Sequence, residues 1–243
     1  SSSAASDVYK RQERYSFQAH GSGKSGIIQV TRCGQEVLER TACEIEEKTG
    51  NIIVRFEVGF PARGRTIQAG ELIKILYQYL PACVEKALYY KNMDQNAVKR
   101  AAELAVDQEY IREQLKKEGL IAFVADGAIL PRESGVSQRP MKDAVPFVSP
   151  DSMKVTMKLP YKGVLTGMGI RKGITLVVGG GYHGKSTLLK ALESGVYPHI
   201  AGDGREYVVT DDTAMKIRAE DGRSIRHTDT ISYTHLTLPT KRI

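Results

Sequence analysis

Three β-branched runs near the start of the chain predict short strands. The runs are bounded by Gly, Asn or Pro, as is typical of strands that end in turns. They cover residues 27–31, 40–45 and 52–58. Together they predict a β-rich segment between residues 27 and 65.

The pattern becomes helical between residues 66 and 118. Four apolar residues from Leu72 to Tyr79 fall on one face of a helix, and Pro81 predicts the start of a second helix. The charged segments 97–104 and 109–115 continue the helical spacing. The strands and helices together predict an α+β N-terminal domain.

Strands return in the second half of the chain. β-branched or alternating runs predict them at residues 120–124, 153–159, 207–210 and 215–218. Asp126-Gly127 predicts a turn, and the three prolines between residues 140 and 150 predict an extended connection. We expect this connection to join the N-terminal domain to a second domain.

Residues 179–187 read Gly-Gly-Gly-Tyr-His-Gly-Lys-Ser-Thr and fit the Walker A pattern of Gly, four residues and Gly-Lys-Ser. The apolar run 174–178 before them predicts a buried strand, and four apolar residues from Leu188 to Leu192 predict a helix after them. A chance match of the pattern alone is expected in about one chain in a hundred. The flanking strand and helix favour a phosphate-binding loop.

The residue types in this loop suit the binding of ATP with Mg²⁺. Glycines let backbone N–H groups approach phosphates, Lys185 carries a charge for the β and γ phosphates, and Ser186 Oγ is placed to ligate the metal. Thr187 falls near the α phosphate. The predicted ATP-binding residues are Gly179, Gly180, Gly181, Tyr182, His183, Gly184, Lys185, Ser186 and Thr187, with Ser186 as the Mg²⁺ ligand.

The segment 167–190 resembles the predicted ATPases of the ABC class, which are stand-alone relatives of the ABC transporter ATPases. Segments 123–132, 195–206 and 219–224 carry the same resemblance, which runs from about residue 22 to 229. Ordinary ABC loops usually have Gly where this chain has Tyr182, and this difference marks the subfamily. The resemblance implies an ABC-type α/β P-loop NTPase domain that hydrolyses ATP to ADP and phosphate and forms a homodimer around ATP.

The sequences at both ends of the chain indicate an artificial origin for these ends. Residues 2–12 can be encoded by DNA that resembles a transposase-based sequencing adapter, and residues 232–240 by its reverse complement. We therefore expect artefacts at 1–12 and 232–243, an N-terminal α+β domain at 13–150, and the incomplete start of the ATPase domain at 151–231. The chain carries a net charge of +7, of which residues 13–231 carry +4, a balance that permits a nucleic-acid partner without requiring one.

The sequence after the phosphate-binding loop contains no recognisable catalytic residues. An ABC ATPase uses a Walker B aspartate, a following glutamate and a signature segment, and no apolar run ending in Asp-Glu follows Thr187. The carboxylates after the loop fall on the following helix, before a strand or in turn-like segments, where we expect none of them to activate water. They are Glu193, Glu206, Asp211, Asp212 and Asp221. We expect the parent protein to be an ATPase, and this chain alone to be inactive with no identifiable catalytic residue.

Two other functions remain open from the sequence. Tyrosines interleaved with lysines between residues 74 and 91 could bind RNA or DNA under the control of ATP, although a packed helical hairpin explains them as well. A P-loop small-molecule kinase would need a substrate pocket further along the chain. Gly21-Ser-Gly-Lys-Ser25 lacks the first glycine of the Walker A pattern, and we expect it to be a turn before a strand.

Three further features complete the sequence-based predictions. Asp126 and Arg132 could pair with each other or face the nucleotide, and Tyr161 could stack on adenine or lie in the core or in a turn. No apolar run approaches the roughly 18 residues of a membrane span. The three cysteines contain no Cys-x-x-Cys pair, so we expect a cytoplasmic protein with reduced thiols and no membrane partner.

Overall fold

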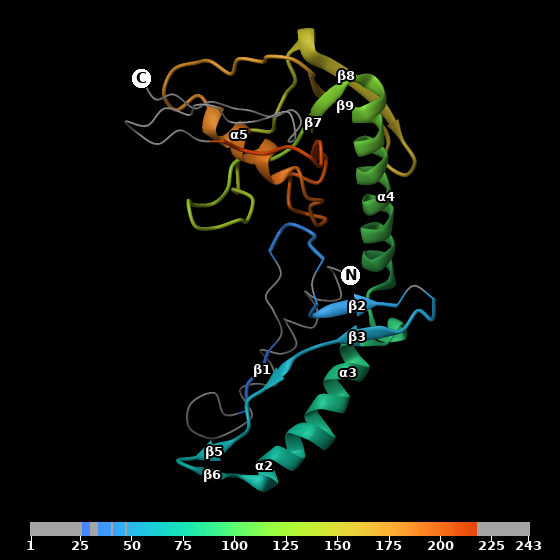
Figure 1. Ribbon diagram of the computed structural model, residues 1–243, viewed down its shortest axis with the longest axis vertical. Helices are drawn as coiled ribbons and strands as arrows, with labels where there is room; N and C mark the ends of the chain where they lie inside the picture. Colours follow the sequence, from blue (N-terminus) through green and yellow to red (C-terminus); the bar gives the residue numbers. More distant parts are fainter. Residues whose placement is uncertain (1–25, 30–33, 40, 47, 218–243) are drawn as a thin grey trace. The chain divides into compact units, whose positions relative to one another are not determined.

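The computed structural model describes residues 26–29, 34–39, 41–46 and 48–217, and it divides the chain into two compact units, Ser1–Ala101 and Ala102–Ile243 (Figure 1). Several predictions lie outside the described residues: the turn at 21–25, both adapter-like ends, the family-like segment 219–224, and Asp221. Each unit is considered by itself below.

Unit 1 contains short antiparallel strands in pairs. β1 (Ile28–Gln29) pairs with β4 (Glu57–Val58), β2 (Cys43–Ile45) with β3 (Ile52–Val54), and β5 (Ala62–Arg63) with β6 (Thr66–Ile67). β1 to β4 fall within the predicted runs, but they are shorter. The β5–β6 hairpin was not predicted, and Thr66 and Ile67 form a strand where the helical pattern was expected to begin. Two-stranded pairs of this length form few backbone hydrogen bonds and have little stability on their own.

The first helical segment of unit 1 changes its winding at a proline. α2 (Ala69–Lys74) continues as the π-helical turn η1 (Ile75–Tyr79) and then as α3 (Leu80–Leu88), and the 3₁₀ turn η2 (Tyr90–Asn92) follows. Pro81 lies at the start of α3, as predicted, but no loop precedes it. Because proline has no N–H, it cannot complete an α-helical hydrogen bond there, and a wider turn accommodates it.

α4 (Gln95–Glu118) is one helix of 24 residues where the sequence suggested two helical segments. The Asp94 carboxylate accepts a hydrogen bond from the Ala97 N–H at 3.0 Å and caps the first turn. Gly119, with a φ of 66°, ends the helix in the left-handed conformation. Ile111 and Leu115 are fully buried, so the helix contributes an apolar face to the core of unit 2.

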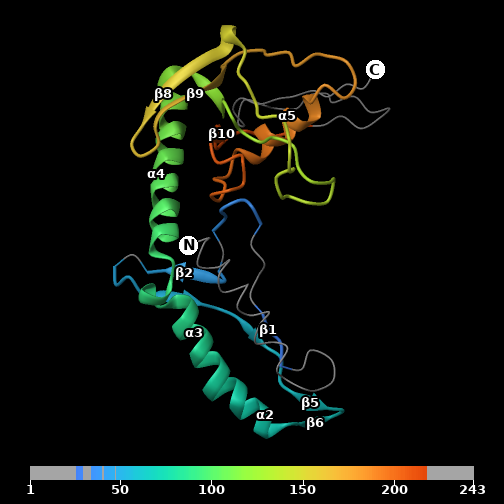
Figure 2. The ribbon, with the colours of Figure 1, turned by 180° about the vertical axis from the view of Figure 1, so that it is seen from behind.

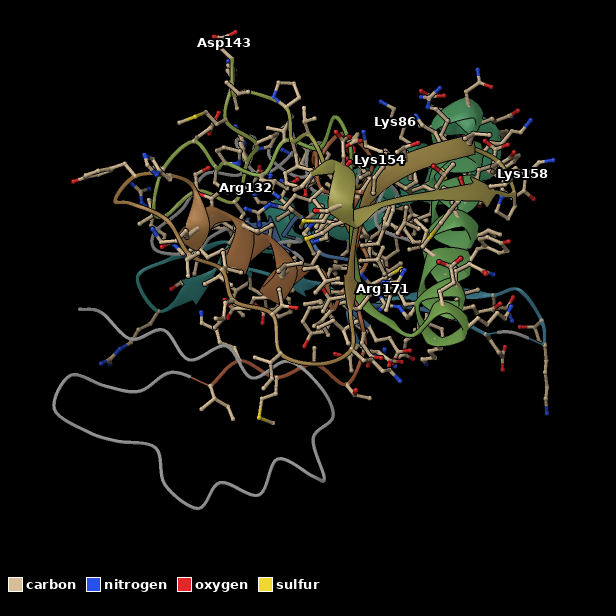
Figure 3. The ribbon with its side chains drawn as sticks, turned by 90° about the horizontal axis from the view of Figure 1, so that it is seen from above. Lys86, Arg132, Asp143, Lys154, Lys158 and Arg171 are labelled. Carbon is tan, nitrogen blue, oxygen red and sulfur yellow. The ribbon has the colours of Figure 1, made fainter. Side chains whose placement is uncertain are left out.

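Unit 2 is built on a four-stranded antiparallel sheet. The strands are β7 (Leu120–Ala125), β8 (Lys154–Leu159), β9 (Gly163–Arg171) and β10 (Val208–Thr210), in the order β10-β7-β9-β8. The 3₁₀ turn η3 (Asp151–Met153) leads into β8. Three of these strands were predicted, whereas the glycine-rich β9 was not. Figure 3 shows Lys154, Lys158 and Arg171 along the β8–β9 ribbon.

The sheet carries a core cluster on each face. Ile111 and Leu115 of α4 pack with Phe123 on one face, and Leu192 of α5 (Lys185–Ser194) packs with Val124 on the other. Figures 1 and 2 show the two helices on opposite sides of the sheet. A shift in register between Leu120 and Ala122 interrupts the alternation along β7. Buried on both faces, β7 is the centre of the unit.

The expected domain boundary near residue 150 falls inside unit 2. β7, which precedes residue 150, pairs with β9 along its length, and η3 and β8 continue the same unit. The hydrogen bonds between these strands join segments on both sides of the prolines. Residues 215–217 form no strand, contrary to the prediction, and residue 218 lies outside the described part of the chain.

Candidate functional site

The phosphate-binding pattern lies on a loop that leads directly into α5. Gly184 precedes the helix with a φ of 78°, and the Leu188 N–H donates the first intrahelical hydrogen bond to its carbonyl at 2.9 Å. No side chain caps this end of the helix. The first amides of α5 are therefore available to an external acceptor, where the helix dipole also favours an anion.

The predicted strand before the loop is not formed. Residues 174–178 belong to no strand, and Ile174 and Leu176 are 97% and 79% exposed. The prediction from the apolar pattern is wrong in this respect, because a strand also needs a neighbour for its backbone hydrogen bonds. None of the described strands pairs with this run.

The Lys185 ammonium folds back onto its own loop. Its Nζ donates hydrogen bonds to the carbonyls of Gly179 at 2.6 Å and Gly180 at 2.5 Å. Within the described part of the chain, the hydroxyls of Ser186 and Thr187 have no hydrogen-bond partner. A flexible lysine can exchange such carbonyl contacts for a phosphate, and two free hydroxyls on the first turn suit a metal ion or a phosphate oxygen.

Two backbone positions explain the composition of the loop. A Cβ on Gly180 would lie only 3.0 Å from His183 Cε1, so a larger residue would crowd the ring. Tyr182 has a φ of 63° and is fully exposed. A left-handed conformation costs a non-glycine residue about 1–2 kcal/mol, which is the physical reason for a glycine at this position in ordinary loops. Here a tyrosine adopts it.

A cavity of about 320 Å³ opens beside this loop. Its apolar side comes from the segment between residues 130 and 147, from the end of the run before the loop and from the first turn of α5. The members of that side are Leu130, Pro131, Val145, Phe147, Val177, Val178 and Leu188. Lys185, Thr187 and His183 add polar groups from the phosphate-binding pattern. The cavity therefore joins an apolar wall to the free amides of the helix.

A buried ion-pair network holds the segment that forms this wall. Arg132 Nη2 lies 2.7 Å from Asp203 Oδ2, and Arg132 Nη1 donates to the Asp203 carbonyl at 2.8 Å. His199 Nδ1 lies 2.7 Å from the same carboxylate oxygen, without the geometry of a hydrogen bond. Asp203 and His199 are almost fully buried. Arg132 therefore has a structural partner, and this partner is not Asp126.

Asp126 also has its own structural role. Its carboxylate accepts hydrogen bonds from the Ser149 N–H at 2.5 Å and from the Ser149 hydroxyl at 3.0 Å. These bonds tie the turn after β7 to the segment before η3. Of the two alternatives left open by the sequence, a direct pair between Asp126 and Arg132 is not formed.

Sequence reasoning assigned no role to two buried residues that support the site. Arg205 donates from Nε to the Leu130 carbonyl at 3.1 Å, and a second hydrogen bond runs from its Nη2 to the same oxygen. Gln108 Nε2 donates to the carbonyls of His199 and Glu206 at 2.9 and 2.8 Å. The segment 195–206 had been noted only for its family resemblance. Its contacts with residues far away in the sequence leave no periodic signal.

Tyr161 does not line the cavity. It lies in the turn between β8 and β9, is 58% exposed, and donates its N–H to Asp107 Oδ1 at 2.9 Å. The Lys162 N–H donates to the other oxygen of Asp107 at 2.8 Å. These bonds fix the turn to α4, so the tyrosine is a turn residue.

The carboxylates considered for catalysis are engaged elsewhere. Glu193 pairs with Lys216 at 2.5 Å, and Asp212 lies 3.5 Å from Lys116. Glu206 accepts from the Gly202 N–H at 2.5 Å, and Asp211 accepts from the Thr213 N–H at 2.9 Å. None of these four residues lines the cavity.

Comparison with known families gives the class of the protein. A model of the ABC ATPase P-loop domain matches residues 94–242, and a model of the N-terminal region of ABC-class ATPases matches residues 2–91. The chain therefore belongs to the family of ABC-class ATPases, with an α+β N-terminal region followed by a P-loop domain. Both matches include adapter-like residues, so the artificial origin of the two ends stays a prediction.

One curated relative adds to this comparison. The uncharacterized protein MJ1628 of Methanocaldococcus jannaschii is 28% identical over 151 residues. The match covers 59% of this chain and 34% of the relative, so the chain spans about a third of that protein's length. Among the described residues, no helix is long and apolar enough to cross a membrane.

Proposed function

We propose that residues 179–187 bind the triphosphate of ATP together with Mg²⁺. The observation that carries this proposal is the uncapped start of α5 behind a glycine loop. Among the described residues, Lys185 is held only by loop carbonyls. The ABC-class P-loop family supports the same ligand. The residues present fit ATP with Mg²⁺, because the loop and the first turn of α5 bring together free amides, the Lys185 ammonium and two hydroxyls without a partner in the described part of the chain.

Each residue of the loop has a distinct task in this proposal. Lys185 leaves the carbonyls of Gly179 and Gly180 to contact the β and γ phosphates, and Ser186 Oγ holds Mg²⁺. The first N–H groups of α5 donate hydrogen bonds to the remaining phosphate oxygens. Bound Mg²⁺ supplies charge neutralisation across the β and γ phosphates.

We propose further that ATP hydrolysis belongs to the full-length protein and not to this chain alone. The four described candidate carboxylates are engaged in other contacts, so none is positioned to activate water. The Walker B, glutamate and signature functions would come from other parts of a homodimer. A purified chain that releases phosphate in a Lys185-dependent way would contradict this proposal.

Calorimetric titration with Mg-ATP tests the binding site. Lys185→Ala should weaken binding by about 2–4 kcal/mol, because it removes a charge-assisted contact to phosphate. Lys24→Ala is the matched control, since Lys24 also stands in a Gly-Lys-Ser sequence but lacks the full pattern. Unchanged affinity in Lys185→Ala, or equal loss in both variants, would overturn the assignment.

A second candidate function, nucleic-acid binding by unit 1, is favoured by its exposed tyrosines. Tyr77, Tyr89 and Tyr90 are 77%, 51% and 58% exposed, and Lys91 Nζ lies 5.7 Å from the centre of the Tyr89 ring. Exposed rings beside lysines can stack bases and contact phosphates. Binding of single-stranded RNA that weakens steeply with salt, and that Tyr89→Ala reduces, would support this function. Its absence at low salt would exclude it.

A further inference from the structure

The β8 edge of the four-stranded sheet in unit 2 lies in a stretch of sequence with an unusual charge balance. Between Asp151 and Glu193 the sequence contains seven Lys or Arg residues and no acidic residue. We propose that β8 is a docking site for an acidic, extended segment of a partner protein, which adds to the sheet as a further strand. This inference does not depend on nucleotide binding, because β8 contributes no residue to the cavity beside the phosphate-binding loop.

β8 has a paired neighbour on one side only. All six of its residues pair with β9, from Lys154 opposite Met168 to Leu159 opposite Gly163. Within the described part of the chain, no backbone hydrogen bond joins β8 to any other strand. A strand in this position presents a row of N–H and C=O groups along its outer side. An extended peptide can pair with such a row and gain affinity from main-chain hydrogen bonds.

The two faces of β8 differ in polarity. Lys154, Thr156 and Lys158 are exposed on one face. Met157 and Leu159 are buried on the other face, in the core cluster to which α4 contributes. Side chains on the same face of adjacent strands lie close enough to interact. The strand that pairs best with β8 therefore has acidic residues at every second position, with apolar residues between them.

The lysines on the exposed face have little charge compensation. Lys154 Nζ lies 2.9 Å from Asp151 Oδ1, but the Asp151 side chain is 97% exposed, so water screens this pair. Lys158 has no acidic partner among the described residues. Figure 3 shows the two lysines towards the two ends of the β8 ribbon. Four residues of a strand span about 13 Å, and carboxylates four positions apart on an extended peptide have the same spacing.

The same charges disfavour a second copy of this chain at this edge. Lysines on edge strands prevent like edges from pairing, because two such edges repel each other. An acidic strand is attracted by the charges that exclude a copy, so the edge discriminates between the two. A nucleic acid would contact the lysines through its phosphates, but it has no strand backbone to pair with the open edge. An acidic peptide uses both the charges and the backbone groups of β8.

Titration of the full chain with a synthetic peptide tests this docking site. The probe is a capped peptide of about eight residues that alternates Glu and Val, which matches the usual length of a strand. A peptide of equal length and charge that alternates Glu and Pro is the control, because every second residue lacks an N–H. The Glu-Val peptide should shift the NMR signals of β8 amides, and the Glu-Pro peptide should bind at least about tenfold more weakly. Equal binding of the two peptides, or shifts that avoid β8, would overturn the proposal.

A charge reversal on β8 provides the matched pair of variants. Lys158→Glu should weaken binding of the Glu-Val peptide about tenfold, because an attractive contact becomes repulsive. Lys142→Glu changes the net charge equally at an exposed position outside the sheet, and it should leave the affinity within about twofold. Circular dichroism spectra of both variants should match that of the unmodified chain, which shows that they are folded. Equal loss of affinity in the two variants would refute a specific contact at β8.

Two other occupants of the edge are distinguished by the same NMR signals. Single-stranded RNA that shifts the β8 amides and binds more tightly than the Glu-Val peptide would overturn the proposal in favour of a nucleic acid. Protection of β8 amides that increases with protein concentration, without any peptide, would overturn it in favour of a second copy of the chain. Mg-ATP binding should be equal in Lys158→Glu and in the unmodified chain, so a failure of the docking site leaves the proposed function intact.

Discussion

Two apolar runs of similar composition behave in opposite ways in unit 2. Leu120–Ala125 forms β7, whose six residues are all buried. Residues 174–178 contain four β-branched residues and a leucine, yet Ile174, Leu176 and Val178 are 97%, 79% and 80% exposed. β7 has β10 and β9 on its two edges and a core cluster on each face. The run before the loop has no paired neighbour among the described strands.

This difference teaches that burial depends on partners and not only on composition. A strand satisfies its backbone N–H and C=O groups on neighbouring strands, and its side chains gain free energy only where another surface excludes water. An apolar run without a neighbour is a surface that another strand can pair with. The predictions below test how large the difference is.

Hydrogen exchange should show the largest contrast. Amides of β7 should exchange only through openings close to the full free energy of unfolding, about 5–15 kcal/mol, because they are paired and buried. Amides of 174–178 should exchange with an opening free energy near zero. Exchange measured by mass spectrometry or NMR checks both segments in one sample. Strong protection at 174–178 would reveal a strand neighbour that the described residues do not include.

Truncation of the two runs should differ by several kcal/mol. Phe123→Ala should lower the free energy of unfolding of unit 2 by about 3–5 kcal/mol, because it leaves a cavity between β7 and α4. Ile174→Ala should change it by less than about 0.5 kcal/mol. Denaturant unfolding followed by circular dichroism measures both. A similar loss of unfolding free energy in the two variants would contradict the difference in burial between the two runs.

A single added methyl group should disturb the strand beside β7. A Cβ on Gly167 would lie 2.4 Å from the Val124 carbonyl oxygen and 2.7 Å from Phe123 Cζ. Gly167→Ala should therefore cost about 1–3 kcal/mol of unfolding free energy. Gly135→Ala is the control, since no atom lies within 4 Å of its added Cβ. A stable Gly167→Ala variant would show that β7 and β9 pack less closely.

The smallest expected effect is a pH dependence of the unfolding free energy that arises from Tyr207, the residue before β10 on the other edge of β7. Burial, with the charges of Asp107 and Glu206, raises the pKa of Tyr207 to about 12, and the Tyr207 carbonyl accepts from the Ala125 N–H. In the unfolded chain the phenol titrates near pH 10. The stabilisation of the folded state that this pKa shift represents is therefore fully present below pH 10 and is lost as the pH rises to 12. Because solvent still reaches the ring, we expect a loss of about 1 kcal/mol.

Tyr207→Phe is the matched variant for the pH measurement, since it retains the ring and removes the titrating hydroxyl. Its stability should depend less on pH between 10 and 12 than that of the unmodified chain. Chemical denaturation at pH 9, 10.5 and 12 provides the comparison. Identical pH profiles would show that the hydroxyl remains solvated in the folded chain.

Local patterns in the sequence predicted most of the regular elements. Helical spacing placed α5 directly after Gly184, and apolar runs placed β7, β8 and β10. These predictions succeeded because helix spacing, turn residues and β-branched runs act over a few residues. β9 was missed because Gly163, Gly167 and Gly169 weaken a strand pattern, although two of them sit where another atom comes close.

The sequence by itself determined the family, the phosphate-binding pattern and the helix that follows it. Only the tertiary structure decided that Arg132 pairs with Asp203, that Arg205 holds the Leu130 carbonyl, and that Phe147 lies beside the loop. These contacts join residues between about 30 and 75 positions apart, and such separations leave no period in a sequence. Local spacing fixes which backbone forms a helix or turn, whereas partners across the fold fix which side chains are buried and which remain available to a ligand.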